Sequence, residues 1–136
     1  MKIKVLGTRG EIEESAPYHA KKSGILLDDL ILLDWGEPNY IEYQPDAIFL
    51  THLHPDHAYF VRYKEKPLTN AKIYAPEKYE NLAKIKVLHK PLTWNQYVIR
   101  PIPTIHSAKV KSQAYIIEHQ NKKILYTGDM IWIEKK

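Results

Sequence analysis

The chain contains no cysteine, and this absence restricts both its stabilisation and its chemistry. Neither a disulfide framework nor a thiolate metal site can form. Any metal must be bound by imidazole and carboxylate groups, a ligand set that suits catalytic zinc, manganese or iron better than a structural site. The lack of cysteine also fits a reducing compartment.

Long apolar runs and blocks of like charge are also missing. The first seven residues are too short an apolar run for a signal peptide, and no later segment has the length of a membrane span. We therefore expect a cytoplasmic protein with no membrane partner. The formal net charge of +4 is interpreted first as solvated surface lysines, because no five like charges are adjacent. Its second interpretation is a mild preference for an anionic partner, such as nucleic acid or a phosphate ester.

Short strand-like runs dominate the 136 residues, and we expect one α+β domain over residues 1–136. A nearly continuous apolar run at 46–50 predicts a strand buried on both faces. Pro101 and Pro103 place the run 97–105 at an edge or a bend. Pro76 is predicted to begin a helix through Leu82. The expected strands are residues 3–6, 24–27, 30–34, 46–50, 72–75, 97–105, 113–118 and 123–127, with tight hairpins at 28–29 and 120–122.

Four ligand-type residues follow the predicted strand at 46–50 within six positions, in the motif His52-Leu53-His54-Pro55-Asp56-His57. A strand projects alternate residues to one side, so His52 and His54 can face the same cation. Pro55 breaks the strand, which lets Asp56 and His57 approach from a second direction. The motif thus predicts two adjacent ligand sets, whose cations could share one hydroxide. A solvated loop with incidental histidines is the alternative.

Two further ligand-type residues lie just past predicted strands. His106 follows the strand 97–105, and Asp129 follows the strand 123–127 after Gly128, which allows a sharp turn of the backbone. Functional residues concentrate in such loops on a rigid scaffold. A lone His after a strand is more often structural, and Gly-Asp is a common turn, but together with the central motif the two residues indicate one metal site.

The order H-x-H-x-D-H, then a single His, then Gly-Asp, resembles the metallo-β-lactamase-fold hydrolases. The opening segment 5–10 and the segment from Ser23 to Gly36 are similar to that family's first strand and early hairpin. The resemblance implies an αββα sandwich with metals at one edge of two sheets. It further implies that Asp34 orients the motif loop. The implied ligands are His52, His54 and His106 for a first metal, Asp56 and His57 for a second, and Asp129 as a bridge between them.

The family pattern continues beyond the Gly-Asp motif to another helix, another strand and a last His ligand, whereas this chain has seven residues after Asp129. We therefore expect the second half of the sandwich to be incomplete and the second metal to lack a ligand. His119 precedes Asp129 and is out of order for that role. A minimal form, a fragment and a subunit completed by a partner chain are all compatible with the sequence. An incompletely covered sheet favours a homo-oligomer.

The hypothesis for function is metal-assisted hydrolysis, with Asp56 orienting the nucleophile or acting as general base. Zn²⁺ is the expected cofactor, with Mn²⁺ or Fe²⁺ as alternatives and one or two ions per chain. The substrate is a small ester or lactone, or a phosphodiester, with nucleic acid as a candidate partner. Lys109 and Lys111 favour the phosphodiester but also fit an ordinary surface. The rival hypothesis is a metal-binding relative without turnover, or one half of a larger assembly.

Overall fold

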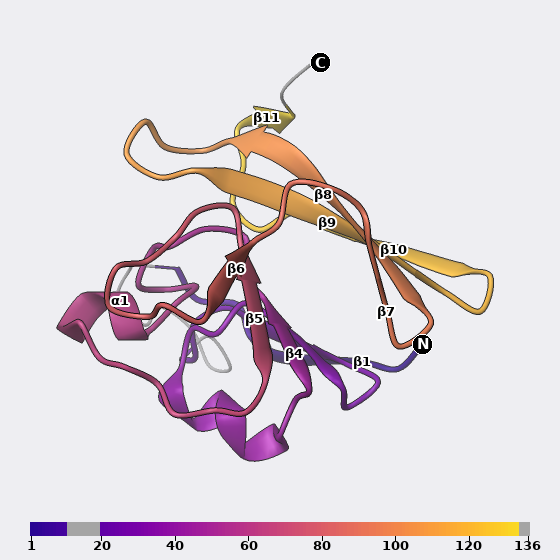
Figure 1. Ribbon diagram of the computed structural model, residues 1–136, viewed down its shortest axis with the longest axis horizontal. Helices are drawn as coiled ribbons and strands as arrows, with labels where there is room; N and C mark the ends of the chain where they lie inside the picture. Colours follow the sequence, from indigo (N-terminus) through magenta and orange to yellow (C-terminus); the bar gives the residue numbers. More distant parts are fainter. Residues whose placement is uncertain (11–19, 134–136) are drawn as a thin grey trace.

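The computed structural model describes residues 1–10 and 20–133, which form two β-sheets packed face to face (Figure 1). The first sheet is mixed. Its first three strands are antiparallel, and the strands from β3 to β6 are parallel. Its strands lie in chain order: β1 (Ile3–Gly7), β2 (Gly24–Leu27), β3 (Ile31–Leu33), β4 (Ala47–Phe49), β5 (Lys72–Ala75) and β6 (Ile85–Val87).

The second sheet is antiparallel and has the order β10-β9-β8-β11, with β7 also pairing with β8. Two residues, Gln120 and Asn121, close its hairpin β9–β10, and three residues, 28–30, close the hairpin β2–β3 of the first sheet. Both residues of the first turn and the first two of the second, Asp28 and Asp29, have positive φ. Such turns match the twist of the strands that they join. The strands are β7 (Leu92–Trp94), β8 (Tyr97–Ile105), β9 (Ser112–His119), β10 (Lys122–Tyr126) and β11 (Trp132–Ile133).

Apolar side chains fill both faces of the central parallel strands. Ile48 of β4 packs into the cluster outside the first sheet, together with Trp35 and Phe60. Phe49 of the same strand packs between the sheets, where it lies edge to face with Tyr115 of β9. This alternation explains the continuous apolar run and confirms the prediction of a strand buried on both faces.

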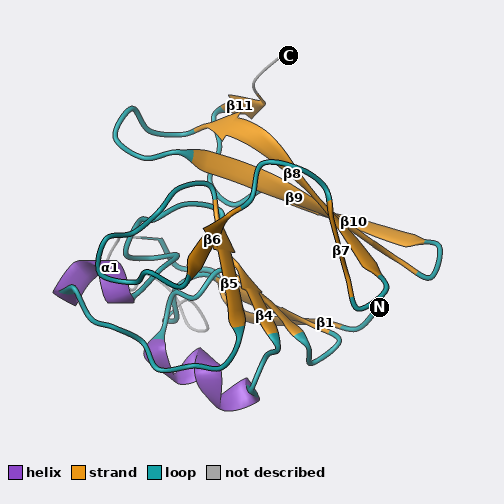
Figure 2. Ribbon diagram, in the orientation of Figure 1, coloured by secondary structure: helices purple, strands orange, loops and turns teal. Residues whose placement is uncertain are grey.

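The described ranges contain two short helical segments, and both lie on the side of the first sheet away from the second (Figures 1 and 2). They are the 3₁₀ helix η1 (Pro38–Tyr43) and the α-helix α1 (Phe60–Tyr63). Among the described residues no helix covers the outer face of the second sheet. The α+β class and the incomplete second half of the sandwich agree with the prediction. No helix in the described part of the chain is long and apolar enough to span a membrane.

Two predictions about single elements need correction. Residues 76–82 form bends and turns instead of a helix, with an isolated bridge between Tyr79 and Leu82. A segment of this length has little intrinsic helical stability, and burial of Leu82 in the core outweighs it. The strand β8 is internal at both ends, where β7 and β11 pair with it. Pro101 and Pro103 lie in the stretch between those pairings, so the edge prediction holds only for that stretch.

Candidate metal centre

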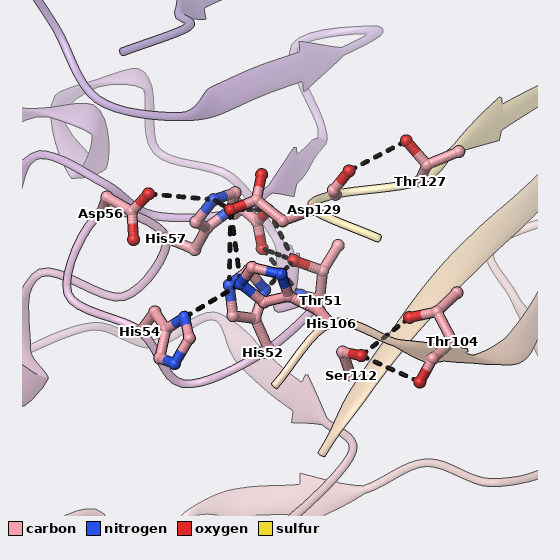
Figure 3. A network of polar contacts seen from close by, with 12 residues as sticks. Thr51, His52, His54, Asp56, His57, Thr104, His106, Ser112, Thr127 and Asp129 are labelled. Carbon is pink, nitrogen blue, oxygen red and sulfur yellow. Dashed lines mark hydrogen bonds and ion pairs between the residues drawn. The ribbon is translucent and has the colours of Figure 1, made fainter. Parts of the chain in front are cut away.

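The predicted site residues converge where the parallel strands end (Figure 3). Asp34 directly follows β3, and the motif beginning at His52 follows β4. His106 directly follows β8 of the second sheet, and Asp129 follows β10. The carboxyl ends of parallel strands are the usual position of ligand sites in such sheets. Segments far apart in sequence thus meet at one edge of the sandwich.

The first ligand group consists of His52, His54 and His106, whose candidate ligand atoms all lie within 4.8 Å of one another. His52 is fully buried, whereas His54 and His106 are half-buried. The Nε2 of His106 lies 3.3 Å from the Nδ1 of His54. Three imidazoles around one point are a ligand set typical of catalytic zinc. This is the trio that the family resemblance implies for a first metal.

The second group consists of His52, His57 and Asp129. The Nε2 of His57 lies 3.3 Å from a carboxylate oxygen of Asp129 and 3.3 Å from one of Asp56. The same Asp129 oxygen lies 3.7 Å from His106 Nε2 and 3.9 Å from His52 Nε2. Asp129 therefore lies between the two groups, as a bridging carboxylate must. All six predicted residues come together here.

The buried carboxylate of Asp34 orients the side chains of this centre through hydrogen bonds. Its carboxylate accepts hydrogen bonds from the Nδ1–H of His57 at 2.6 Å, from the backbone N–H of Thr51 at 2.7 Å and from the hydroxyl of Tyr126 at 3.0 Å. It is completely buried, so these donors take the place of water. The bond to Nδ1 directs the Nε2 of His57 toward the other ligands, as metal-binding histidines require.

Thr51 transmits this orientation to His52. Its hydroxyl donates to Asp34 at 2.9 Å and lies 2.8 Å from the Nδ1 of His52. Because the hydroxyl proton is directed to the carboxylate, the oxygen can only accept from His52, which assigns the proton of that ring to Nδ1. The Nε2 of His52 then presents its lone pair to the site, which is the form that binds a cation.

The electrostatics of the two buried histidines differ. Burial, followed by the nearby His57, lowers the pKa of His52 to about 4, so the ring is neutral at pH 7. Burial alone would also lower the pKa of His57, but the carboxylates of Asp34, Asp129 and Asp56 outweigh it and raise that pKa to about 12. The hydrogen-bonded contact with His57 comes first among the causes that lower the pKa of Asp129 to about 2. The metal-free centre thus holds a proton on His57 between three carboxylates.

The donor set fits a divalent cation. The buried Nε2 of His52 has no hydrogen-bond partner among the described residues, and the buried Nε2 of His57 has only the carboxylates of Asp56 and Asp129, each 3.3 Å away. A buried polar atom without a partner costs about 1–3 kcal/mol, so such an atom calls for an explanation. Both atoms belong to the group whose ligand atoms lie within 4.8 Å of one another, where a cation would satisfy both at once.

Two supporting residues were not found from the sequence, and one excluded histidine lies elsewhere. Thr51 and Tyr126 carry no ligand-type signal; only the position of Thr51 directly before the motif pointed toward it. His119 stacks on Tyr97, with 4.0 Å between the ring centroids. Tyr97 begins β8 and Ile105 ends it, about 26 Å apart at the rise of a strand, so His119 is remote from the centre.

Gly128 is the residue whose substitution should disturb the centre without removing a ligand. Its φ is +58°, and a Cβ added there would lie 2.5 Å from Thr51 Oγ1. We expect Gly128→Ala to lower the free energy of unfolding by about 3 kcal/mol, from backbone strain and overpacking together. Urea denaturation of the metal-free protein measures this.

Gly10→Ala is the matched control for that substitution, because the nearest atom to its Cβ among the described residues would be an Asp56 oxygen at an ordinary 3.7 Å. Its stability should remain within about 0.5 kcal/mol of wild type. Equal stabilities of the two variants would contradict the close packing of Gly128 on Thr51.

Comparison with known families identifies the superfamily of this chain. The model of the metallo-beta-lactamase superfamily matches residues 37–136, which include the whole candidate centre except Asp34. The chain therefore belongs to the metallo-beta-lactamase superfamily. No curated protein sequence matches the chain.

Solved structures share the fold at low sequence identity. The metallo-beta-lactamase fold protein YhfI from Bacillus subtilis is 21% identical, with a TM-score of 0.63 over 93% of this chain and 61% of its own. Human tRNase Z, short form (ELAC1), is 15% identical, with a TM-score of 0.66 over 98% and 71%. A diphosphatase from the PhnP family is 21% identical, with a TM-score of 0.56 over 85% and 61%. This chain thus spans less than two thirds of the length of two of these three proteins.

Proposed function

We propose that this chain is a metal-dependent hydrolase that cleaves phosphodiesters. One observation carries the proposal: the buried Nε2 of His52 has no hydrogen-bond partner among the described residues, and it belongs to one group of close ligand atoms with the buried Nε2 of His57 and the Asp129 carboxylate. A solely structural network would pair these atoms with one another or with backbone groups. Membership of a superfamily that includes hydrolases supports the same conclusion.

The residues that would hold the first cation are His52, His54 and His106, and those for a second are His57, Asp56 and Asp129. Zinc suits this set, and manganese and iron are alternatives. When bound there, such a cation supplies Lewis acidity and lowers the pKa of a bound water toward neutrality.

The chain's own groups have three tasks in this reaction. Asp34 and Thr51 hold the His57 and His52 rings in the ligand tautomer. Asp56 is the candidate general base: burial opposes its ionisation, but its contact with His57 lowers its pKa, so the carboxylate is ionised at pH 7 and can accept a proton from water. The half-exposed His54, His106 and Asp129 form the side that substrate can reach.

The choice of a phosphodiester rests on charge and on the neighbours. The chain carries a formal net charge of +4, which favours an anionic substrate. Two structural neighbours are named as a tRNase and a diphosphatase. Carboxylic esters and lactones are the alternative substrates, since the same metal chemistry acts on carbonyl carbon.

The test is turnover by the purified full chain after loading with zinc or manganese. We expect hydrolysis of bis(p-nitrophenyl) phosphate that disappears on chelation and returns when the metal is added back. Hydrolysis of a lactone but not of the phosphodiester would correct the substrate class. A metal-loaded protein that turns over neither would contradict the hydrolase and favour a metal-binding relative without turnover.

A further inference from the structure

A hollow of about 340 Å³ lies directly beside the candidate metal centre. Ile105 and Ser107, which flank His106 in the chain, both line it. Gln113 lines it as well, and its backbone N–H donates to the carbonyl of Thr51, the residue before His52, at 2.9 Å. The hollow therefore shares its wall with the metal centre but lies outside the ligand groups.

Three of the polar side chains that line the hollow, those of His89, Ser107 and Lys111, have hydrogen bonds left to give, whereas Thr104, Ser112 and Gln113 already donate to other groups. The backbone N–H of Lys111 donates to Glu77 at 2.7 Å, which fixes this loop, while its ammonium group has no hydrogen bond or ion pair with any described residue. His89 likewise has none. The Ser107 hydroxyl accepts from the backbone of Lys109, so its own proton is still available. No carboxylate is among the described residues that line the hollow.

Apolar groups complete the lining. Pro76, Pro103, Ile105 and Val110 contribute hydrocarbon surface next to the donors. Charged and hydroxyl donors beside an apolar wall suit an organic phosphate: the donors pair with the phosphate oxygens, and the hydrocarbon part lies against the prolines. A neutral ester would leave Lys111 without a partner.

We propose that this hollow is a substrate subsite that binds a phosphate group other than the one being hydrolysed, through Lys111, His89 and Ser107. The inference rests on the proposed function for the scissile bond, because the metal centre must hold that phosphate. It specifies the substrate class as a chain of at least two phosphates, such as an oligonucleotide backbone. Of Lys109 and Lys111, the two lysines within five residues after His106, only Lys111 lines the hollow.

Binding is tested on the metal-free full chain by NMR titration with phenyl phosphate, with phenol as the neutral comparison. We expect shifts at His89 and Lys111 and none at His119. Lys111→Met should weaken phenyl phosphate binding about tenfold, because it removes a charge-assisted hydrogen bond. Lys109→Met is the matched control, because it removes the same charge from the same loop, but Lys109 does not line the hollow. The Lys109→Met variant should therefore bind phenyl phosphate with the affinity of wild type.

Shifts confined to His54 and His106, or equal affinities of the two lysine variants, would overturn the subsite. A second measurement uses the zinc-loaded protein and two thymidine dinucleotides that differ only in a terminal 5′-phosphate. Lys111→Met should raise the KM only for the phosphorylated dinucleotide. An unchanged KM overturns the subsite while leaving the hydrolase intact. Binding by the metal-free chain without turnover of either dinucleotide contradicts the hydrolase and supports the subsite.

Discussion

Replacing His52 with alanine is expected to abolish the stabilisation that zinc gives to the protein. His52 belongs to both ligand groups, so its loss removes a ligand from each. A ligand that binds only the folded state stabilises it by about 4 kcal/mol at about 1,000 times its Kd. Loss of even an outer partner of a metal ligand costs about 10–100-fold in affinity, so loss of this shared ligand should cost more than about 100-fold. Thermal unfolding with and without zinc measures the effect.

The metal-free His52→Ala protein should still fold. The side chain removed has a buried Nε2 without a partner, so the substitution also relieves an unfavourable group. His54→Ala removes a ligand from one group only and should weaken the zinc effect without abolishing it. His119→Ala, remote on Tyr97, should respond to zinc as wild type does. A His52→Ala protein that zinc stabilises like wild type would contradict the shared ligand position.

Replacing Asp34 with asparagine is expected to lower the free energy of unfolding of the metal-free protein by about 3–5 kcal/mol. The carboxylate is completely buried and accepts from His57, Thr51 and Tyr126. The amide of asparagine has one acceptor oxygen where the carboxylate has two, and its NH₂ group would face these donors without an acceptor to bond to. Asp29→Asn is the matched control, because that carboxylate is exposed and, among the residues that the structure describes, forms an ion pair with Lys2 alone, so its loss should cost less than about 1 kcal/mol.

The difference in free energy of unfolding between wild type and Asp34→Asn should decrease as the pH rises. The pKa of His57 is about 12 in the folded protein and 6.5 in an unperturbed histidine. Burial opposes this shift, and Asp34 contributes most to raising the pKa. The stability that it provides is therefore fully present below pH 6.5 and is lost as the pH rises toward 12. In urea denaturation, the free energies of unfolding of wild type and Asp34→Asn should therefore become more similar between pH 6.5 and pH 12. A difference in free energy of unfolding that increases with pH would contradict a protonated His57 paired with Asp34.

The sequence predicted those elements whose signals are local. The hairpin β2–β3 and the buried strand β4 follow from a polar turn and an apolar run. The strands β6, β7 and β11 were missed because segments of two or three residues show too little periodicity to be recognised. The false helix at 76–82 had a start signal at Pro76, but the burial of Leu82 is a tertiary effect that periodicity does not report.

More of the candidate centre than of the fold could be predicted from the sequence, because the residue types themselves reveal which side chains can bind a metal. The clustered motif, His106 and Asp129 were found by their positions after strands, and the structure brings them together. The roles of Thr51 and Tyr126 depend on the path of the chain around Asp34, which a single sequence does not give. The homo-oligomer, the cytoplasmic location and the identity of the metal stay predictions.

The most direct test of the central claim is the metal bound by the purified full chain after zinc loading and dialysis. The buried histidine nitrogens and the bridging position of Asp129 predict one or two equivalents of zinc. X-ray absorption should then show only nitrogen and oxygen neighbours, since the chain has no cysteine. A zinc content no higher than that of the His52→Ala variant would contradict the metal centre itself.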